Sequence, residues 1–242
     1  MKLEDIFKPD NFFALSLDEA RPELERCMYS YLGIFPLQVG ERPQTDGKRI
    51  FLEGKKTEFQ DDKDEMHNNR NMSLYLSDLI HELLHIREGS FLVDGRQYLE
   101  TFKNPGLAHA VFNIVEDARI EHNARKYLRA DDTELLQKSN EFLATKRNFP
   151  ETTQDRFMEV YSSQMITKGR PSQFNQDHRV AEQETLDTKI EHPDLTSRGI
   201  NNVSDLLRES VGLSERVYDD SVESTWEVVP QVYDMLTKAF PN

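Results

Sequence analysis

The sequence contains the pattern His-Glu-Leu-Leu-His at residues 81–85, inside a run of apolar residues with helical spacing. The apolar residues of the run are Leu76, Leu79, Ile80, Leu83, Leu84 and Ile86, and Gly89 follows them. This spacing predicts a helix over residues 73–88 with a broad buried face. Residues four apart lie on one face of a helix, so His81 and His85 are expected to point in the same direction.

Two imidazoles on one helical face can bind a single zinc ion, each at about 2.0–2.1 Å. Glu82 lies beside the first histidine, where it can reach a water molecule and act as a general base. Polar side chains on a mostly buried helix need partners, and a metal would satisfy them. The alternative is a surface histidine pair on an ordinary amphipathic helix.

A catalytic zinc site has three protein ligands and one open position, so a third ligand must come from another element. Residues 113–122 read NIVEDARIEH and place carboxylates within an apolar helical pattern. We expect Glu116 to be the third ligand, with Asp117 as its rival. Asp117 and Glu121 are four residues apart, so one can bind the metal while the other orients a ligand histidine. The alternative is a solvated face of salt bridges.

Other local signals predict a mostly helical α+β fold. Ser16 and Glu19 have capping-box spacing before an apolar stripe that ends at Gly33. Asn104 and Pro105 predict the start of a helix that reaches about residue 128. Further helices are predicted near residues 132–145, 153–167, 202–211 and 220–239, with a kink or restart of the last one at Pro230.

A small sheet is expected beside the histidine helix. The runs 35–39 and 49–52 resemble strands, and the glycines and proline between them predict a β-hairpin. Residues 53–71 are mostly polar and predict a surface loop. These patterns suggest a metal-binding domain at 1–167, a polar linker or mobile excursion at 168–200, and a helical segment at 201–242 that packs on the main domain.

Charge and composition limit the partners and the location. The net charge of −14 disfavours binding to nucleic-acid phosphates. No run approaches the roughly 18 apolar residues of a membrane span, and the N-terminus lacks a basic start followed by an apolar run. Cys27 is the single cysteine, which fits a reducing compartment. We therefore expect a cytoplasmic protein that binds neither membranes nor nucleic acid.

The HExxH pattern, followed by a glutamate on a later helix, resembles the gluzincin arrangement of zinc metallopeptidases. This resemblance implies a zincin-like domain in which the active-site helix lies under a small sheet and a following helix supplies the third ligand. It also implies Zn²⁺ as the cofactor and a peptide or protein as the substrate, aligned along an edge strand.

A second resemblance covers roughly residues 48–128 and includes the string FNIVEDARIE at residues 112–121, of which E-D-A-R-x-E at 116–121 is the most specific part. This region is similar to the N-terminal region of the NorD/CobT group. The resemblance implies partnership with a MoxR-like AAA+ ATPase in metalloenzyme maturation. The chain departs from that group because no D-x-S-x-S motif of a von Willebrand factor A domain follows residue 130.

Three functions follow as hypotheses. The first is a zinc-dependent peptidase in which Glu82 is the general base. The second is a non-catalytic metal-binding module that recruits a partner such as the ATPase. The third is a helical domain without metal. An intact Glu82 favours the enzyme, because a structural zinc site has no need for that carboxylate.

Overall fold

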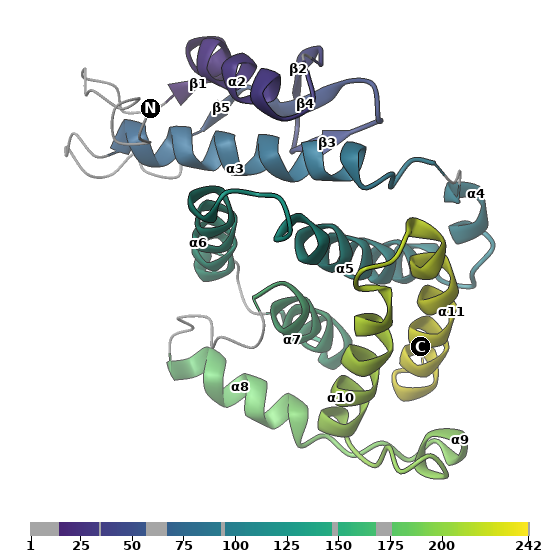
Figure 1. The fold of residues 1–242 in the computed structure, drawn as a ribbon. Coiled ribbons are helices and arrows are strands. Elements are labelled where there is room, and N and C mark those ends of the chain that lie inside the picture. Colours follow the sequence, from purple (N-terminus) through teal and green to yellow (C-terminus); the bar gives the residue numbers. More distant parts are fainter. Residues whose placement is uncertain are drawn as a thin grey trace. The chain divides into compact units, whose positions relative to one another are not determined.

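The computed structural model describes residues 15–33, 35–56, 67–92, 95–146, 150–167 and 176–241. It confirms a mostly helical α+β chain with a small sheet (Figure 1). The chain divides into two compact units. The N-terminal unit comprises Met1–Phe91 and Leu128–Ser139, and the C-terminal unit comprises Leu92–Tyr127 and Asn140–Asn242. The predicted domain of residues 1–167 coincides with neither unit.

In the N-terminal unit, two helices and a three-stranded sheet share one core. The helices are α2 (Leu17–Tyr31) and α3 (His67–Arg87), and the sheet has the order β2 (Leu37–Gly40), β4 (Ile50–Glu53), β3 (Gln44–Thr45). Two further strands, β1 (Leu15–Ser16) and β5 (Lys55–Lys56), pair with each other. The core includes Leu24, Met28, Ile50, Leu52, Tyr75, Leu79 and Leu83. The sheet therefore packs against the helix that carries the histidines, as predicted.

The N-terminal end of α2 confirms the predicted capping box, with the side chains of Ser16 and Glu19 each bonded to the backbone of the other. The segment 53–71 is only partly a loop. It contains β5 and the first residues of α3, and residues 57–66 lie outside the described part of the chain.

The two strand-like runs form strands, but the predicted hairpin between them is wrong. β2 and β4 pair in parallel, and β3 lies antiparallel to β4. The tight turn joins β3 to β4: Asp46 Oδ1 accepts hydrogen bonds from the backbone N–H groups of Lys48 and Arg49 at 2.9 and 2.7 Å. Gly47 adopts a φ of +82° in this turn, which favours glycine. The chain therefore reverses at Asp46–Gly47, and β3 takes the antiparallel position.

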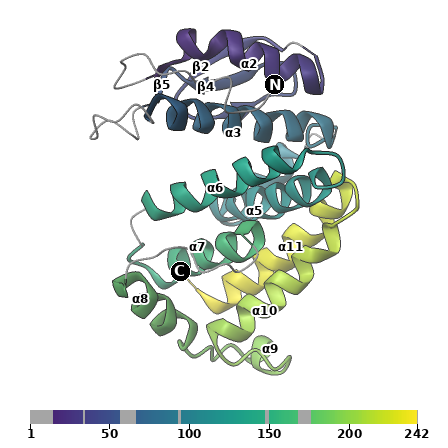
Figure 2. The same cartoon turned by 60° about the vertical axis from the view of Figure 1, so that its left-hand side comes forward.

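In the C-terminal unit, α5 (Pro105–Ala124) packs against α7 (Thr153–Thr167) and α11 (Val222–Ala239), and α10 (Val203–Ser214) packs against the same two helices (Figure 2). The short elements are α4 (Arg96–Leu99) and η1 (Glu215–Val217). Asn104 caps α5 by accepting a hydrogen bond from the backbone N–H of Leu107 at 3.1 Å, as predicted. α6 (Ala130–Lys146) belongs to the N-terminal unit as far as Ser139 and to the C-terminal unit beyond it.

Residues 176–200 are part of the C-terminal unit rather than a linker. They form α8 (Gln176–Leu186) and α9 (Pro193–Thr196), and Ile190, Leu195 and Ile200 are buried in the core of the unit. A few well-spaced apolar side chains are enough to anchor this polar segment. Residues 168–175 of the predicted linker lie outside the described residues.

The predicted restart of the last helix at Pro230 is wrong, because α11 runs without interruption through that residue. Within the described ranges, no helix combines the length and the apolar character needed to span a bilayer.

Candidate metal centre

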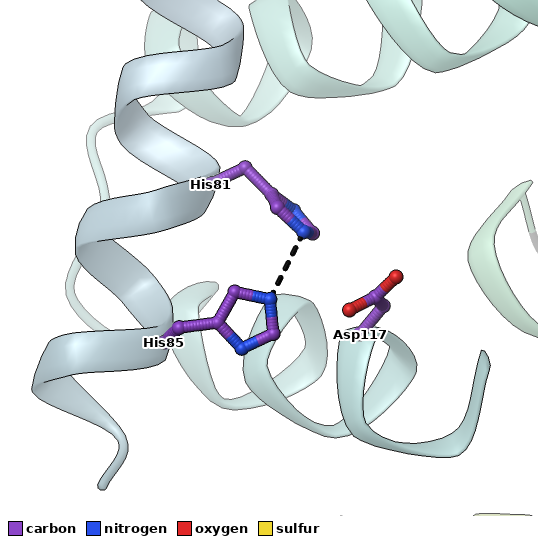
Figure 3. Close-up of side chains that lie close together, drawn as sticks. All are labelled: His81, His85 and Asp117. Carbon is purple, nitrogen blue, oxygen red and sulfur yellow. Dashed lines mark hydrogen bonds between the residues drawn. The ribbon is translucent and has the colours of Figure 1, made fainter. Parts of the chain in front are cut away.

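α3 presents His81 and His85 one helical turn apart. Tyr75, Leu79 and Leu83 on the same helix are buried in the core of the N-terminal unit and fix its orientation. Both histidines are half-buried. Their Nε2 atoms lie 3.2 Å apart, and the two rings meet edge to face at 85° (Figure 3). The predicted alignment of the two imidazoles is therefore present within this unit.

The distance between the two Nε2 atoms fits joint binding of one metal ion. Two ligands at about 2.05 Å from a tetrahedral zinc ion lie about 3.3 Å from each other. The distance between His81 Nε2 and His85 Nε2 is 3.2 Å. Between neutral rings at this distance, one nitrogen donates a proton to the lone pair of the other. A metal ion would replace that proton, and the Nε2 atoms of both histidines would then each direct a lone pair at the ion.

Ser90 orients the second histidine. Its Oγ lies 3.0 Å from His85 Nδ1, the ring nitrogen that faces away from His81. When Nδ1–H donates to Ser90 Oγ, the Nε2 atom of His85 carries the lone pair that a metal requires. Sequence reasoning missed Ser90, although its position directly after Gly89 is a usable signal.

The end of α3 places Ser90 at this position. Gly89 has a φ of +75°, and its N–H donates to the carbonyl oxygen of Ile86 at 3.4 Å. The N–H of Ser90 donates to the carbonyl oxygen of His85 at 3.0 Å. These two hydrogen bonds form a Schellman motif, for which a glycine in the left-handed conformation is favoured. The predicted stop at Gly89 therefore also brings the Ser90 hydroxyl back to the histidine.

If His81 and His85 hold a zinc ion, replacing Ser90 by alanine is expected to weaken zinc binding by about 10-fold, at the lower end of the range for lost orienting partners of ligand histidines. The fold should survive, because the backbone hydrogen bonds of the motif do not involve the hydroxyl. Competition with a chromophoric chelator measures the affinity. Ser90→Thr, which retains the hydroxyl, is the matched control. An unchanged affinity in Ser90→Ala would show that the hydroxyl does not orient His85.

Glu82, the predicted general base, follows His81 on α3. Glu82 is buried, with only 5% of the residue exposed to solvent. A buried carboxylate is costly without polar partners, and Glu82 has such interactions. A carboxylate next to a candidate ligand histidine suits proton transfer.

Glu116, the predicted third ligand, forms a buried ion pair with Arg119. Its Oε1 accepts from Arg119 Nη2 at 2.6 Å and its Oε2 accepts from Arg119 Nε at 2.9 Å. Thr225 of α11 donates a further hydrogen bond to Oε2 at 2.7 Å. Both side chains of the pair are 1% exposed. A metal would have to displace this bidentate pair in order to bind Glu116.

The other acidic candidates on α5 differ in their environment. Asp117 is half-buried, and Figure 3 draws its side chain. Glu121 is 9% exposed, and its Oε1 accepts a hydrogen bond from Asn140 Nδ2 at 3.1 Å. The side-chain amide of Asn140 thus provides a hydrogen-bond partner for this buried carboxylate.

The remaining histidines of α5 have partners of their own in the C-terminal unit. His109 Nε2 lies 3.0 Å from Glu100 Oε1. His122 stacks on Tyr218, with ring centroids 4.1 Å apart, and its Nε2 lies 3.4 Å from Asp219 Oδ1. Each of these two histidines thus has a carboxylate close to its Nε2 atom within its own unit.

No family model, no curated protein and no protein of solved structure matches this chain. The resemblances to gluzincins and to the NorD/CobT group therefore stay predictions from the motifs.

Proposed function

We propose that this chain binds a zinc ion through His81, His85 and Asp117 (Figure 3). The observation that carries the proposal is the 3.2 Å separation of the two histidine Nε2 atoms, which suits two ligands of one tetrahedral ion. The third ligand of the proposal is Asp117, the rival that the sequence offers beside Glu116. Asp117 takes the place first expected for Glu116, because Arg119 and Thr225 already occupy the Glu116 carboxylate.

The proposed activity is hydrolysis of peptide bonds. A bound zinc ion would supply a Lewis acid that polarises a carbonyl group and lowers the pKa of water. Glu82 would accept the proton from the attacking water and pass it to the departing amine nitrogen. With its Nδ1–H donated to Ser90 Oγ, His85 would direct the lone pair of its Nε2 atom at the site. The substrate class is therefore a peptide or protein.

Cys27 is poorly suited to act as a catalytic nucleophile or as a metal ligand. Burial raises the pKa of the Cys27 thiol to about 12, so the thiol stays protonated at neutral pH. A protonated thiol is neither a good nucleophile nor a metal ligand. The proposed cytoplasmic location rests on the sequence alone, because a single cysteine fits a reducing compartment.

The ligand assignment is tested by replacing Asp117 with asparagine. We expect zinc affinity to fall by more than about 100-fold, beyond the usual effect of losing an orienting partner. The measurement is zinc content after equilibrium dialysis, together with a chelator competition for the affinity. His81→Ala should lose zinc in the same assay.

Glu121→Gln is the matched control on the same helix, since glutamine can still accept the hydrogen bond from Asn140. It should retain about one zinc ion per chain. Zinc loss in Glu121→Gln with full retention in Asp117→Asn would reassign the third ligand to Glu121. Absence of zinc from the unmodified chain after dialysis against zinc would overturn the proposed function.

A further inference from the structure

Phe91 is an exposed aromatic residue close to the paired histidines. It is 40% exposed, whereas phenylalanine is usually buried in folded proteins. The centroid of its ring lies 6.3 Å from that of His85, with the ring planes at 60°. The ring therefore lies within reach of a side chain of a molecule held at the histidines.

The ring is held in place from two sides. The Schellman motif at Gly89 fixes the backbone that leads to Phe91, with Ser90 bonded to His85 through both its N–H and its hydroxyl. On the other side the ring rests against Gly47 in the turn between β3 and β4. A Cβ atom placed on Gly47 would lie only 3.2 Å from Cδ2 of Phe91. The missing side chain at Gly47 thus lets the ring lie against the turn.

We propose that Phe91 is a specificity-determining residue that forms an apolar subsite beside His85, and that the site prefers substrates with an apolar or aromatic side chain next to the reacting carbonyl. This inference rests on the proposed function. A preorganised apolar surface next to a metal site gains binding energy from apolar groups without first having to order itself. Aromatic rings also pair favourably with one another at centroid separations of 4.5–7 Å.

The probes for the test are two zinc-chelating hydroxamates, those of phenylalanine and of glycine, which share a chelating group and differ in the side chain. They are titrated calorimetrically into the zinc-loaded full chain. We expect the phenylalanine probe to bind at least about 10-fold more tightly than the glycine probe, the lower end of discrimination by an apolar pocket. Phe91→Ala should reduce this ratio to below about 3-fold, while Phe91→Leu should retain most of it.

Tyr29 supplies the matched control, because it is an exposed aromatic residue of the same unit at 75% exposure. Tyr29→Ala should leave the ratio unchanged. A ratio near one in the unmodified chain, or an unchanged ratio in Phe91→Ala, would overturn the subsite while leaving the metal site intact. Failure of both hydroxamates to bind the zinc-treated chain would overturn the metal site itself and the subsite with it.

Discussion

Replacing Glu82 by glutamine is expected to abolish peptide hydrolysis while the chain retains its zinc. The substitution preserves size and hydrogen-bonding capacity but removes the group that accepts a proton. General-base catalysis contributes about 10²–10⁴-fold to rates, so we expect kcat to fall by at least about 100-fold. The zinc content should stay near one ion per chain, because Glu82 lies outside the proposed ligand set. Cleavage of a mixture of short peptides, followed by mass spectrometry, measures the activity.

The control for this experiment is Glu88→Gln, which alters a glutamate just after the end of the same helix. It should leave both activity and zinc content unchanged. Hydrolysis by Glu82→Gln at the rate of the unmodified chain would refute the proposed mechanism. A chain that binds zinc but cleaves no peptide, with or without Glu82, would favour the alternative role as a partner-recruiting module.

Replacing Glu116 by glutamine is expected to lower the free energy of unfolding by about 3–5 kcal/mol, because the buried charge of Arg119 loses its bidentate carboxylate. Arg119 is 1% exposed and donates both to Glu116 and to the carbonyl oxygen of Asp220 at 3.0 Å. Thr225 also loses its charged acceptor. Urea unfolding of the metal-free chain, followed by circular dichroism, gives the change in stability.

The double variant Glu116→Met/Arg119→Met separates the two explanations for this carboxylate. If the pair is structural, removing both charges should restore much of the stability lost in Glu116→Gln, since an apolar replacement of a buried pair is often tolerated. If Glu116 were instead a zinc ligand, Glu116→Gln would lower zinc affinity and leave the stability of the metal-free chain nearly unchanged. That second pattern would contradict the assignment made from the ion pair.

Signals that act within a few residues were readable from the sequence. The capping box at Ser16, the Asn104 cap and the stop at Gly89 all occur in the structure as predicted. The helical spacing around His81 likewise predicted the face that α3 buries. Each of these features depends on hydrogen bonds or side-chain directions along one continuous segment, so the local sequence is enough to specify it.

Features that depend on partners distant in the sequence were not readable in the same way. The parallel pairing of β2 with β4 is set by the placement of β3, which the apolar pattern does not reveal. Glu116 was expected to bind metal because its charge lies in an apolar helix. Its charge is neutralised by Arg119, one turn away on the same helix, and the partner distant in the sequence is Thr225, which donates a hydrogen bond from α11. A carboxylate in an apolar helical pattern predicts that a partner is present, but it does not predict whether that partner is a metal ion or another side chain.

The stretch 81–91 carries two proposed ligands, the proposed base, the group that orients a ligand and the apolar ring. Each additional residue in an α-helix rotates everything that follows by about 100°. One residue inserted between His81 and His85 would therefore turn the second imidazole away from the first, and one inserted after His85 would separate Ser90 from it. Substitutions at outward positions of this stretch preserve the arrangement, but changes in its length do not. A gap or insertion inside it would thus mark a related chain that has lost the centre, even with every key residue type still present.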